Sequence, residues 1–288
     1  MPSVVDIASS WLFVPGDRPD RMRKALASAA DVVICDLEDA VSADHKDQAR
    51  TNVVSLLASG ARAVVRVNAV DTPWWGPDIS AVAGAPGVLG MMVPKAESPS
   101  ALSELAARLP SVAVIVPLVE SAAGLDNVMG LTAVQGVGRL AFGSVDYALD
   151  LGCAHEREPL LHARSLLVHA SRRSGLPAPV DGVTQQLRAP ALVVDDTAYA
   201  RRLGFTGKLC IHPEQVELVN TGFAPSPEEL NWARTVLASD SSAGATSVDG
   251  WMVDAPVRSR AELIVCQGQR SPAVARPPLP PVPREERL

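Results

Sequence analysis

Short apolar runs rich in β-branched residues alternate with stretches of helical periodicity along most of the chain, and this alternation restricts the fold more than any other feature. The runs are apolar throughout rather than at every second position, which is typical of parallel strands buried on both faces. Eight such β/α units are enough to close a barrel, which typically needs about 250 residues. The predicted strands span residues 10–16, 31–37, 63–68, 89–95, 112–120, 139–144, 178–183 and 208–213.

We therefore predict an α/β fold, a (β/α)8 TIM barrel with a C-terminal helical lid segment. An open, doubly wound sheet is the alternative, but no GxGxxG pattern follows the first predicted strand. The helix expected at 17–30 begins with Asp17 as a candidate cap and has Pro19 in its first turn.

Composition changes beyond the eighth β/α unit. A helix is expected at 226–239 with a cap at Ser226, and the Ser- and Gly-rich segment 240–250 is expected to be a flexible loop. The last 21 residues hold six prolines and four arginines with almost no apolar core material, which is typical of disorder. The predicted domains are an N-terminal extension at 1–10, the TIM barrel at 11–223, C-terminal helices and lid at 224–267, and a disordered Pro-rich tail at 268–288.

Charge and composition exclude several classes of protein. The net charge is −6, with acidic and basic residues mixed along the chain, so nucleic acid is not an expected partner. The longest apolar run, at 112–119, is far shorter than the roughly 20 residues of a membrane helix, and no signal peptide is visible. The four cysteines form no CxxC pair, and Cys35 and Cys210 lie in strand-like runs, as in reduced cytosolic proteins. We expect a soluble, cytoplasmic protein with no membrane partner.

Polar and charged residues follow nearly every predicted strand at the point where it ends. Active sites of β/α barrels are built at this end of the strands, so these side chains are expected to meet at one rim. Most are acids, which would repel one another in a concave site unless a cation neutralised part of their charge. Mg²⁺ prefers carboxylate oxygens, whereas the five histidines form no zinc-type pair. The strand-end residues are Asp36, Glu38, Asp39, Arg66, Asn68, Lys95, Glu97, Glu120, Asp146, Asp181 and His212.

These residues also have structural interpretations, which the sequence leaves open. The acids at 36–39 could cap the following helix or pair with Arg66, which could itself be only an ion-pair partner. Lys95 could simply open the next helix, and His212 could be a structural imidazole. The two acids after the fifth and sixth strands could form structural salt bridges.

Eight motifs occur in the order seen in one known family. The chain resembles citrate lyase β-subunit-like (CitE-like) proteins of the HpcH/HpaI aldolase superfamily, which are related to malyl-CoA and citramalyl-CoA lyases. The resemblance covers roughly residues 11–263, although Ser10-Trp11 replaces the Arg-Ser that many members carry at this point. The motifs are LFVPGDRPDRMRKA, DLEDAV, VRVN, VPKAES, PLVESAAG, FGSVDYALDLG, GFTGKLCIHPEQ and MVDAPV.

The resemblance implies a cofactor and roles for particular residues. Mg²⁺ is the implied cofactor, and Glu120 and Asp146 match the metal ligands of the family. Arg66 matches the substrate-binding arginine, and Asp254 matches a catalytic aspartate on a C-terminal lid. In the lyase relatives this lid closes over the site of a neighbouring subunit, so a homo-oligomer, often a trimer, with lids exchanged between subunits is implied.

The resemblance also implies a reaction. It is the retro-Claisen cleavage, or the reverse condensation, of a 3-hydroxy-3-carboxy acyl-CoA thioester such as citramalyl-CoA, malyl-CoA or a citryl thioester, with a 2-oxo acid as the other product. Asp254 would protonate the enolate carbon, and Arg66 would stabilise the enolate oxygen. Glu38 and Asp39 would orient Arg66 or water near the metal. The residues expected to contact the substrate are Arg66, Glu120, Lys95 and His212.

Three other functions stay open. The chain could be the β-subunit of a citrate lyase acting on a citryl acyl-carrier protein, or an Mg²⁺-dependent aldolase acting on 2-oxo acids without a thioester. It could also be a non-catalytic scaffold subunit, although a scaffold has no reason to retain the acidic and basic residues of the rim together. The sequence does not determine the acyl group.

Overall fold

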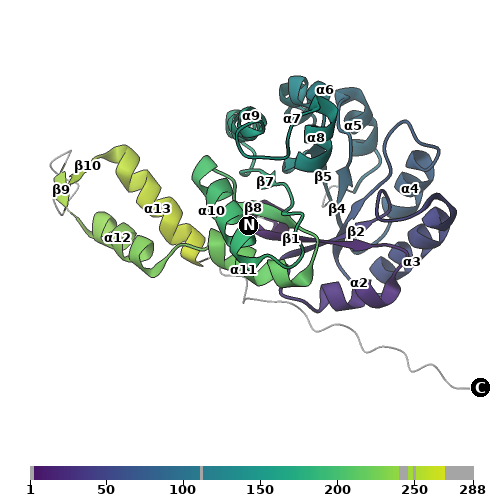
Figure 1. The fold of residues 1–288 in the computed structure, drawn as a ribbon, viewed down its shortest axis with the longest axis horizontal. Helices are drawn as coiled ribbons and strands as arrows, with labels where there is room; N and C mark the ends of the chain where they lie inside the picture. Colours follow the sequence, from purple (N-terminus) through teal and green to yellow (C-terminus); the bar gives the residue numbers. More distant parts are fainter. Residues whose placement is uncertain (1–2, 111–112, 240–245, 249–250, 270–288) are drawn as a thin grey trace, which may run out of the picture. The chain divides into compact units, whose positions relative to one another are not determined.

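Eight parallel strands close into a barrel in chain order, and helices surround it (Figure 1). The computed structural model describes residues 3–110, 113–239, 246–248 and 251–269. The first strand pairs with both the second and the eighth, which closes the sheet and confirms the predicted (β/α)8 barrel. The strands are β1 (Ser10–Pro15), β2 (Val32–Asp36), β3 (Ala63–Arg66), β4 (Val88–Val93), β5 (Val114–Val119), β6 (Ala141–Phe142), β7 (Val180–Asp181) and β8 (Gly207–Cys210).

Helices occupy the connections between the strands, as the alternation predicts. The first of them starts at Pro19, and its N-cap residue Arg18 makes no side-chain cap hydrogen bond, so the predicted cap at Asp17 is wrong. Proline fits the first helical position, so the helix starts too late for Asp17 to reach its free amides. The helices of the connections are α2 (Pro19–Leu26), η1 (Ala43–His45), α3 (Lys46–Ala58), α4 (Trp75–Val82), α5 (Pro99–Ala106), α6 (Ala122–Asp126), α7 (Val128–Thr132), α8 (Ser144–Leu151), α9 (Leu161–Arg173), α10 (Pro190–Leu203) and α11 (Pro213–Phe223).

Two strands are much shorter than the sequence predicts. The run at 178–183 forms only the two residues of β7, and the run at 139–144 forms only the two residues of β6. In β7 the preceding Pro179 has no backbone N–H and cannot donate to a ladder. Apolar runs indicate where a strand lies, but backbone donors decide where its pairing starts.

The strands are buried on both faces. Every residue of β2, β3 and β8 is buried, which is the arrangement that their continuous apolar runs predict. Cys35 and Cys210 are among these core residues, and burial raises the pKa of each thiol to about 12. Both thiols are therefore protonated packing groups rather than nucleophiles.

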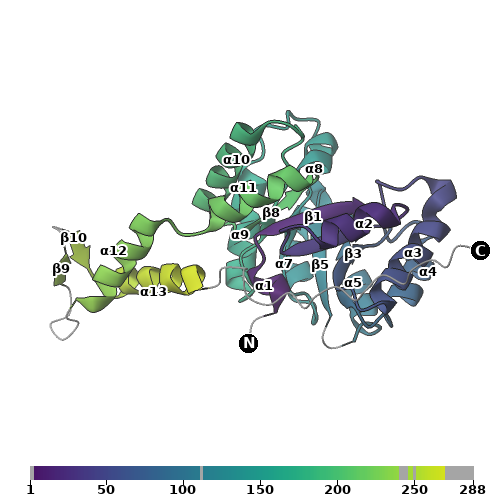
Figure 2. The ribbon, with the colours of Figure 1, turned by 90° about the horizontal axis from the view of Figure 1, so that it is seen from below.

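The N-terminal segment belongs to the barrel core. Helix α1 (Val4–Ile7) directly precedes β1 (Figure 2), and Val5 and Ala8 join the apolar cluster inside the barrel. The fully buried Arg139 fixes this segment, because Nη1 donates to the carbonyl oxygens of Val5 and Ala8 at 2.9 and 2.7 Å. Nε donates to Ala178 O at 2.7 Å, and Nη2 donates to the Thr206 hydroxyl at 2.9 Å. These partners lie before the strands, so Arg139 closes the end of the barrel opposite the rim.

The chain divides into two compact units, and the second begins at Thr221. It has its own apolar cluster, which includes Ala233, Val236 and Ala261. Ser226 caps its first helix in a capping box with Glu229, as predicted. Its elements are α12 (Pro227–Ala238), a hairpin of β9 (Thr246–Val248) and β10 (Trp251–Val253), and α13 (Ala255–Gln269).

Two predictions fall partly or wholly outside the described residues. The segment 240–250, predicted to be a flexible loop, contains the paired strand β9, and its other residues lie outside the described part. The predicted tail at 268–288 starts inside α13, and residues 270–288 lie outside the described part. Within the part of the chain that the structure describes, no helix combines the length and the apolar character needed to cross a membrane.

Replacing Arg139 by methionine is expected to destabilise the barrel by roughly 3 kcal/mol. The substitution leaves buried carbonyl groups without hydrogen-bond donors, and each such group costs about 1–3 kcal/mol. Urea unfolding followed by circular dichroism measures the change. Arg108→Met is the control, since Arg108 is exposed and its guanidinium donates to the exposed Ser80 hydroxyl; it should change stability by no more than about 0.5 kcal/mol. Equal losses in the two variants would contradict the closing role of Arg139.

Candidate active site

The inward-facing positions of the strands change from apolar to charged at the C-terminal rim. Side chains alternate along a strand, so the inner face of β2 continues from Ile34 to Asp36, and that of β5 continues from Leu118 to Glu120. Arg66, at the end of β3, follows Val64 in the same way. The period of two therefore brings these charged residues together above the apolar core.

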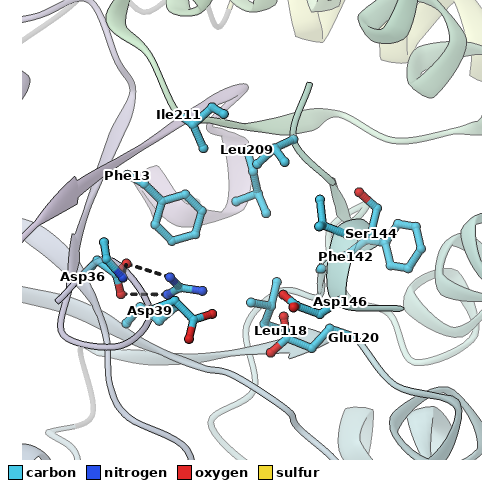
Figure 3. A pocket seen from close by; sticks show the side chains of 15 residues that line it. Phe13, Asp36, Asp39, Leu118, Glu120, Phe142, Ser144, Asp146, Leu209 and Ile211 are labelled. Carbon is cyan, nitrogen blue, oxygen red and sulfur yellow. Dashed lines mark hydrogen bonds and ion pairs between the residues drawn. The ribbon is translucent and has the colours of Figure 1, made fainter. Parts of the chain in front are cut away.

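These residues line a cavity of about 380 Å³ at the rim. Figure 3 shows Asp36 on one side of the cavity, Glu120 and Asp146 together on another, and Phe13, Leu209 and Ile211 along a third. One part of the wall is thus charged and another is apolar. The lining residues are Phe13, Asp36, Asp39, Ala40, Arg66, Leu118, Glu120, Phe142, Gly143, Ser144, Val145, Asp146, Val183, Leu209 and Ile211.

Arg66 is held rigidly in this cavity. Its Nε and Nη2 donate to the two carboxylate oxygens of the fully buried Asp36 at 2.8 and 2.6 Å. Its Nη1 lies 2.9 Å from Glu38 Oε2, and its guanidinium carbon lies 4.8 Å from the centre of the Phe13 ring. Burial alone would lower the pKa of Arg66, but Asp36 and the neighbouring carboxylates raise it above its usual range. Arg66 is therefore a permanent, oriented cation.

The three acids that end β2 have three different environments. Asp36 pairs with Arg66, whereas Glu38 lies between two cations, because its Oε1 accepts from Lys95 Nζ at 2.8 Å. Burial raises the pKa of Glu38, and the charges of Arg66 and Lys95 offset part of that rise. Asp39 is exposed and lines the cavity. The backbone at this strand end is anchored by Lys46, whose Nζ donates to the carbonyls of residues 37 and 38 at 2.7 Å each.

Glu120 is the most perturbed acid of the cavity. Its Oε1 accepts from the backbone amide of Lys95 at 2.7 Å, but its buried Oε2 has no hydrogen-bond partner. Burial, with the charges of Glu38 and Asp146, raises the pKa of Glu120 to about 8, although the amide of Lys95 and the charge of Arg66 oppose the rise. Gly143 leaves space for this side chain, because a Cβ there would collide with the Glu120 carboxylate.

Glu120 and Asp146 come from neighbouring β/α units. Strand β5 pairs with β6, and Gly143 N donates to Val119 O at 2.9 Å, so the first turn of α8 with Asp146 lies beside Glu120. An unpartnered buried oxygen next to a second carboxylate is the donor set that a divalent cation satisfies. In the described residues no group of three or more His, Cys, Asp or Glu side chains forms a cage. The pair thus fits Mg²⁺, which typically takes one or two protein carboxylates.

Two predicted site residues lie outside this cluster. His212 does not line the cavity; its Nδ1 accepts from the amide of Glu214 at 3.3 Å in the first turn of α11. Asp254 lies in the C-terminal unit, where its carboxylate accepts from the amide of Val257 at 3.1 Å and caps α13. Lys95 touches the cluster through Glu38 and Glu120 but does not line the cavity.

Phe13 is a site residue that the sequence did not indicate, and Asp36 is one for which pairing with Arg66 was only one of the interpretations left open. Asp36 fixes the orientation of Arg66, and Phe13 covers one face of the guanidinium. Counting by two from the buried Ile34 would have identified Asp36 as the inward-facing acid of β2. Phe13 had no such signal, because an aromatic residue in an apolar strand is most often part of the core.

The sequence of the chain matches one known protein family. Residues 9–213 match the model of the HpcH/HpaI aldolase/citrate lyase family, which is more than half of the chain. The chain belongs to this family. A citrate lyase subunit beta-like protein of Mycobacterium tuberculosis is 36% identical over 263 residues, which cover 88% of this chain and 93% of that protein. A (3S)-malyl-CoA thioesterase of Cereibacter sphaeroides is 33% identical over 256 residues, which cover 85% and 89%.

A family member of known structure has the same fold. The crystal structure of CitE from Mycobacterium tuberculosis in complex with magnesium, acetoacetate and coenzyme A matches with a TM-score of 0.81 at 35% identity, covering 92% of this chain and 99% of that chain. By family membership the present chain is an enzyme of the carbon–carbon lyase class. The structure of this HpcH/HpaI relative contains magnesium, a small oxo acid and coenzyme A.

Replacing Glu120 by glutamine is expected to change the pH dependence of stability. The folded-state pKa of Glu120 is raised from 4.5 to about 8, so the folded protein binds the proton more tightly and loses stability as the pH rises from about 5 to 8. Each pKa unit corresponds to about 1.4 kcal/mol. With a chelator present to remove metal ions, the free energy of unfolding of Glu120→Gln at pH 8.5 should therefore exceed that of the wild type by an amount of the order of 3 kcal/mol.

Urea unfolding between pH 5.5 and 9 measures this difference. Glu104→Gln is the control, because Glu104 is exposed on α5, and its curve should parallel that of the wild type. A Glu120→Gln curve that also runs parallel to the wild type would show that burial does not perturb this carboxyl.

Proposed function

We propose that the protein is an Mg²⁺-dependent carbon–carbon lyase that cleaves, or forms, a 3-hydroxy-3-carboxy acyl thioester by retro-Claisen chemistry. One observation carries this proposal: the cavity holds an oriented arginine, Arg66, together with Glu120, whose free oxygen faces a second acid. The reaction develops negative charge on two oxygens, at the 3-hydroxyl and at the thioester carbonyl. A site with two separate positive centres fits that requirement.

Glu120 and Asp146 are the residues that would hold the metal. The support is the unpartnered Oε2 of Glu120 and the position of Asp146 in the same cavity. Mg²⁺ bound there would act as a Lewis acid on the oxygens of the 2-oxo acid part of the substrate. The raised pKa of Glu120 supports this assignment, because it arises mainly from burial and also from the charges of Glu38 and Asp146, and a bound cation would offset both effects.

Arg66 would stabilise the enolate oxygen of the departing thioester. A guanidinium has five N–H donors, and two of them are bound by Asp36. Its Nη1 also approaches Glu38, and the remaining donors are available to a ligand in the cavity. Because Asp36 and Phe13 fix the guanidinium before the substrate binds, little reorganisation is needed as charge develops.

Two acids are assigned to proton transfer. Asp39, the exposed carboxylate of the cavity wall, would accept the proton of the 3-hydroxyl as the C2–C3 bond breaks. Asp254 would return a proton to C2 of the thioester enolate, which yields the shortened thioester and the 2-oxo acid.

This role of Asp254 requires the C-terminal unit to act as a lid over a cavity, and we propose that a homotrimer exchanges these lids between subunits. Closure would protect the enolate from bulk water.

The cavity wall favours substrates without an additional carboxylate. Arg66 is the only lysine, arginine or histidine among the fifteen described residues that line the cavity. Phe13, Val183 and Leu209 contribute apolar surface instead. The carboxymethyl group of a citryl thioester would lack a cationic partner there, and a buried carboxylate without one is costly. A malyl or citramalyl thioester, with hydrogen or methyl at this position, fits better.

The substrate assignment is tested by incubating the protein and Mg²⁺ with malyl-, citramalyl- and citryl-CoA and identifying products by mass spectrometry. We expect acetyl-CoA and a 2-oxo acid from the first two thioesters, at least tenfold faster than from citryl-CoA, and no reaction in a chelator. Release of free CoA with the intact hydroxy acid would indicate thioester hydrolysis instead. Preferred cleavage of the citryl thioester would contradict the argument from the cavity wall.

Arg66→Lys is expected to lower kcat by about 10²–10³, the usual effect of removing one oxyanion donor, because lysine cannot keep the bidentate pair with Asp36. Arg164→Lys is a matched control. Arg164 is equally buried and its Nε donates to Asp181 at 2.9 Å, but it does not line the cavity. The two variants should lose similar stability in thermal unfolding, and only Arg66→Lys should lose most of its kcat. Equal losses of kcat in the two variants would contradict the role of Arg66 in stabilising the enolate oxygen.

A further inference from the structure

Lys95 has an unusual backbone conformation. Its φ angle is +47°, and no other non-glycine residue in the described part of the chain has a positive φ. The left-handed region disfavours residues with a Cβ, and lysine has no side-chain group that bonds locally to relieve this. Such a conformation persists only where surrounding interactions impose it, and these positions concentrate at functional sites.

The interactions around Lys95 explain the conformation. The chain leaves β4 at Val93 and returns toward the end of β5, where Ala96 N donates to Leu118 O at 3.3 Å. Between these points the backbone amide of Lys95 donates to Glu120 Oε1 at 2.7 Å. The left-handed turn is therefore what directs this amide toward the carboxylate.

The side chain of Lys95 supports the same arrangement. Its Nζ donates to Glu38 Oε1 at 2.8 Å, and half of the side-chain surface is exposed. Glu38 also contacts Arg66 through its other oxygen. The ion pair with Lys95 thus ties the loop after β4 to the acids after β2 and compensates for an unfavourable backbone.

We propose that Lys95 is a positioning residue whose left-handed backbone amide holds Oε1 of Glu120 and thereby leaves Oε2 aimed at the cation. This inference rests on the proposed function only in taking Glu120 as a metal ligand. A carboxylate with one oxygen fixed by an amide cannot rotate freely, and Gly143 leaves the space that this orientation needs. The backbone of Lys95, rather than its charge, would therefore determine metal affinity.

Two substitutions of Lys95 distinguish the effect of its backbone conformation on Mg²⁺ affinity from the effect of its charge. Lys95→Gly and Lys95→Val both remove the ammonium group, but glycine accepts a positive φ, whereas the β-branched valine strongly resists it. Isothermal titration calorimetry measures the Mg²⁺ affinity of each variant. We expect Lys95→Gly to stay within about threefold of the wild type, and Lys95→Val to bind at least tenfold more weakly.

A second measurement does not depend on the metal. With a chelator present to remove metal ions, the backbone amide proton of residue 95 should resonate downfield in the NMR spectra of the wild type and of Lys95→Gly. A short hydrogen bond to a carboxylate produces such a shift. The shift should be lost in Lys95→Val. Circular dichroism checks that both variants fold, and a misfolded Lys95→Val is replaced by Lys95→Ile.

The outcomes distinguish this inference from the proposed function. Equal Mg²⁺ affinities in the glycine and valine variants, whether both normal or both weak, would overturn the positioning role. A wild type that binds no Mg²⁺ but shows the downfield amide would overturn the proposed metal site while leaving the amide–carboxylate bond in place.

Discussion

Arg66 lies almost fully buried at the top of the barrel, where acceptor groups of the protein must replace the water around its guanidinium. Asp36 supplies that replacement with both of its oxygens. The pair places two opposite charges on neighbouring strands at their C-terminal ends, since Asp36 and Arg66 are register partners in the ladder of β2 and β3. Glu38 pairs with this fixed cation, and the ring of Phe13 lies against it.

The surrounding acids are compensated unequally. Glu38 is shared between Arg66 and Lys95, but Glu120 has one oxygen on a backbone amide and one without a partner. Burial and the repulsion of the neighbouring acids together disfavour the charged form of Glu120 and raise its pKa. This imbalance is the physical reason for expecting a divalent cation at Glu120 and Asp146. It also explains why the site depends on backbone positions such as Lys95, which aim the carboxylate.

Much of this architecture could be predicted from the sequence. The eight strands and the cap at Ser226 were predicted correctly, because buried parallel strands and helix caps depend on local residue patterns. The cap at Asp17 was wrong, and the lengths of β6 and β7 were overestimated. Both errors concern ends of elements, where one proline or one missing donor outweighs the apolar pattern.

The sequence by itself determined the barrel and the presence of charged groups at one rim, because strand period and strand order follow from local chemistry. It also contained the family motifs that led to Arg66, Glu120 and Asp146. Only the tertiary structure decided that Asp36, rather than Glu38 or Asp39, binds Arg66 with both oxygens, and that His212 faces its own helix instead of the cavity. Those choices depend on which side chains of distant strands meet in space, and a single strand does not encode its neighbour's register.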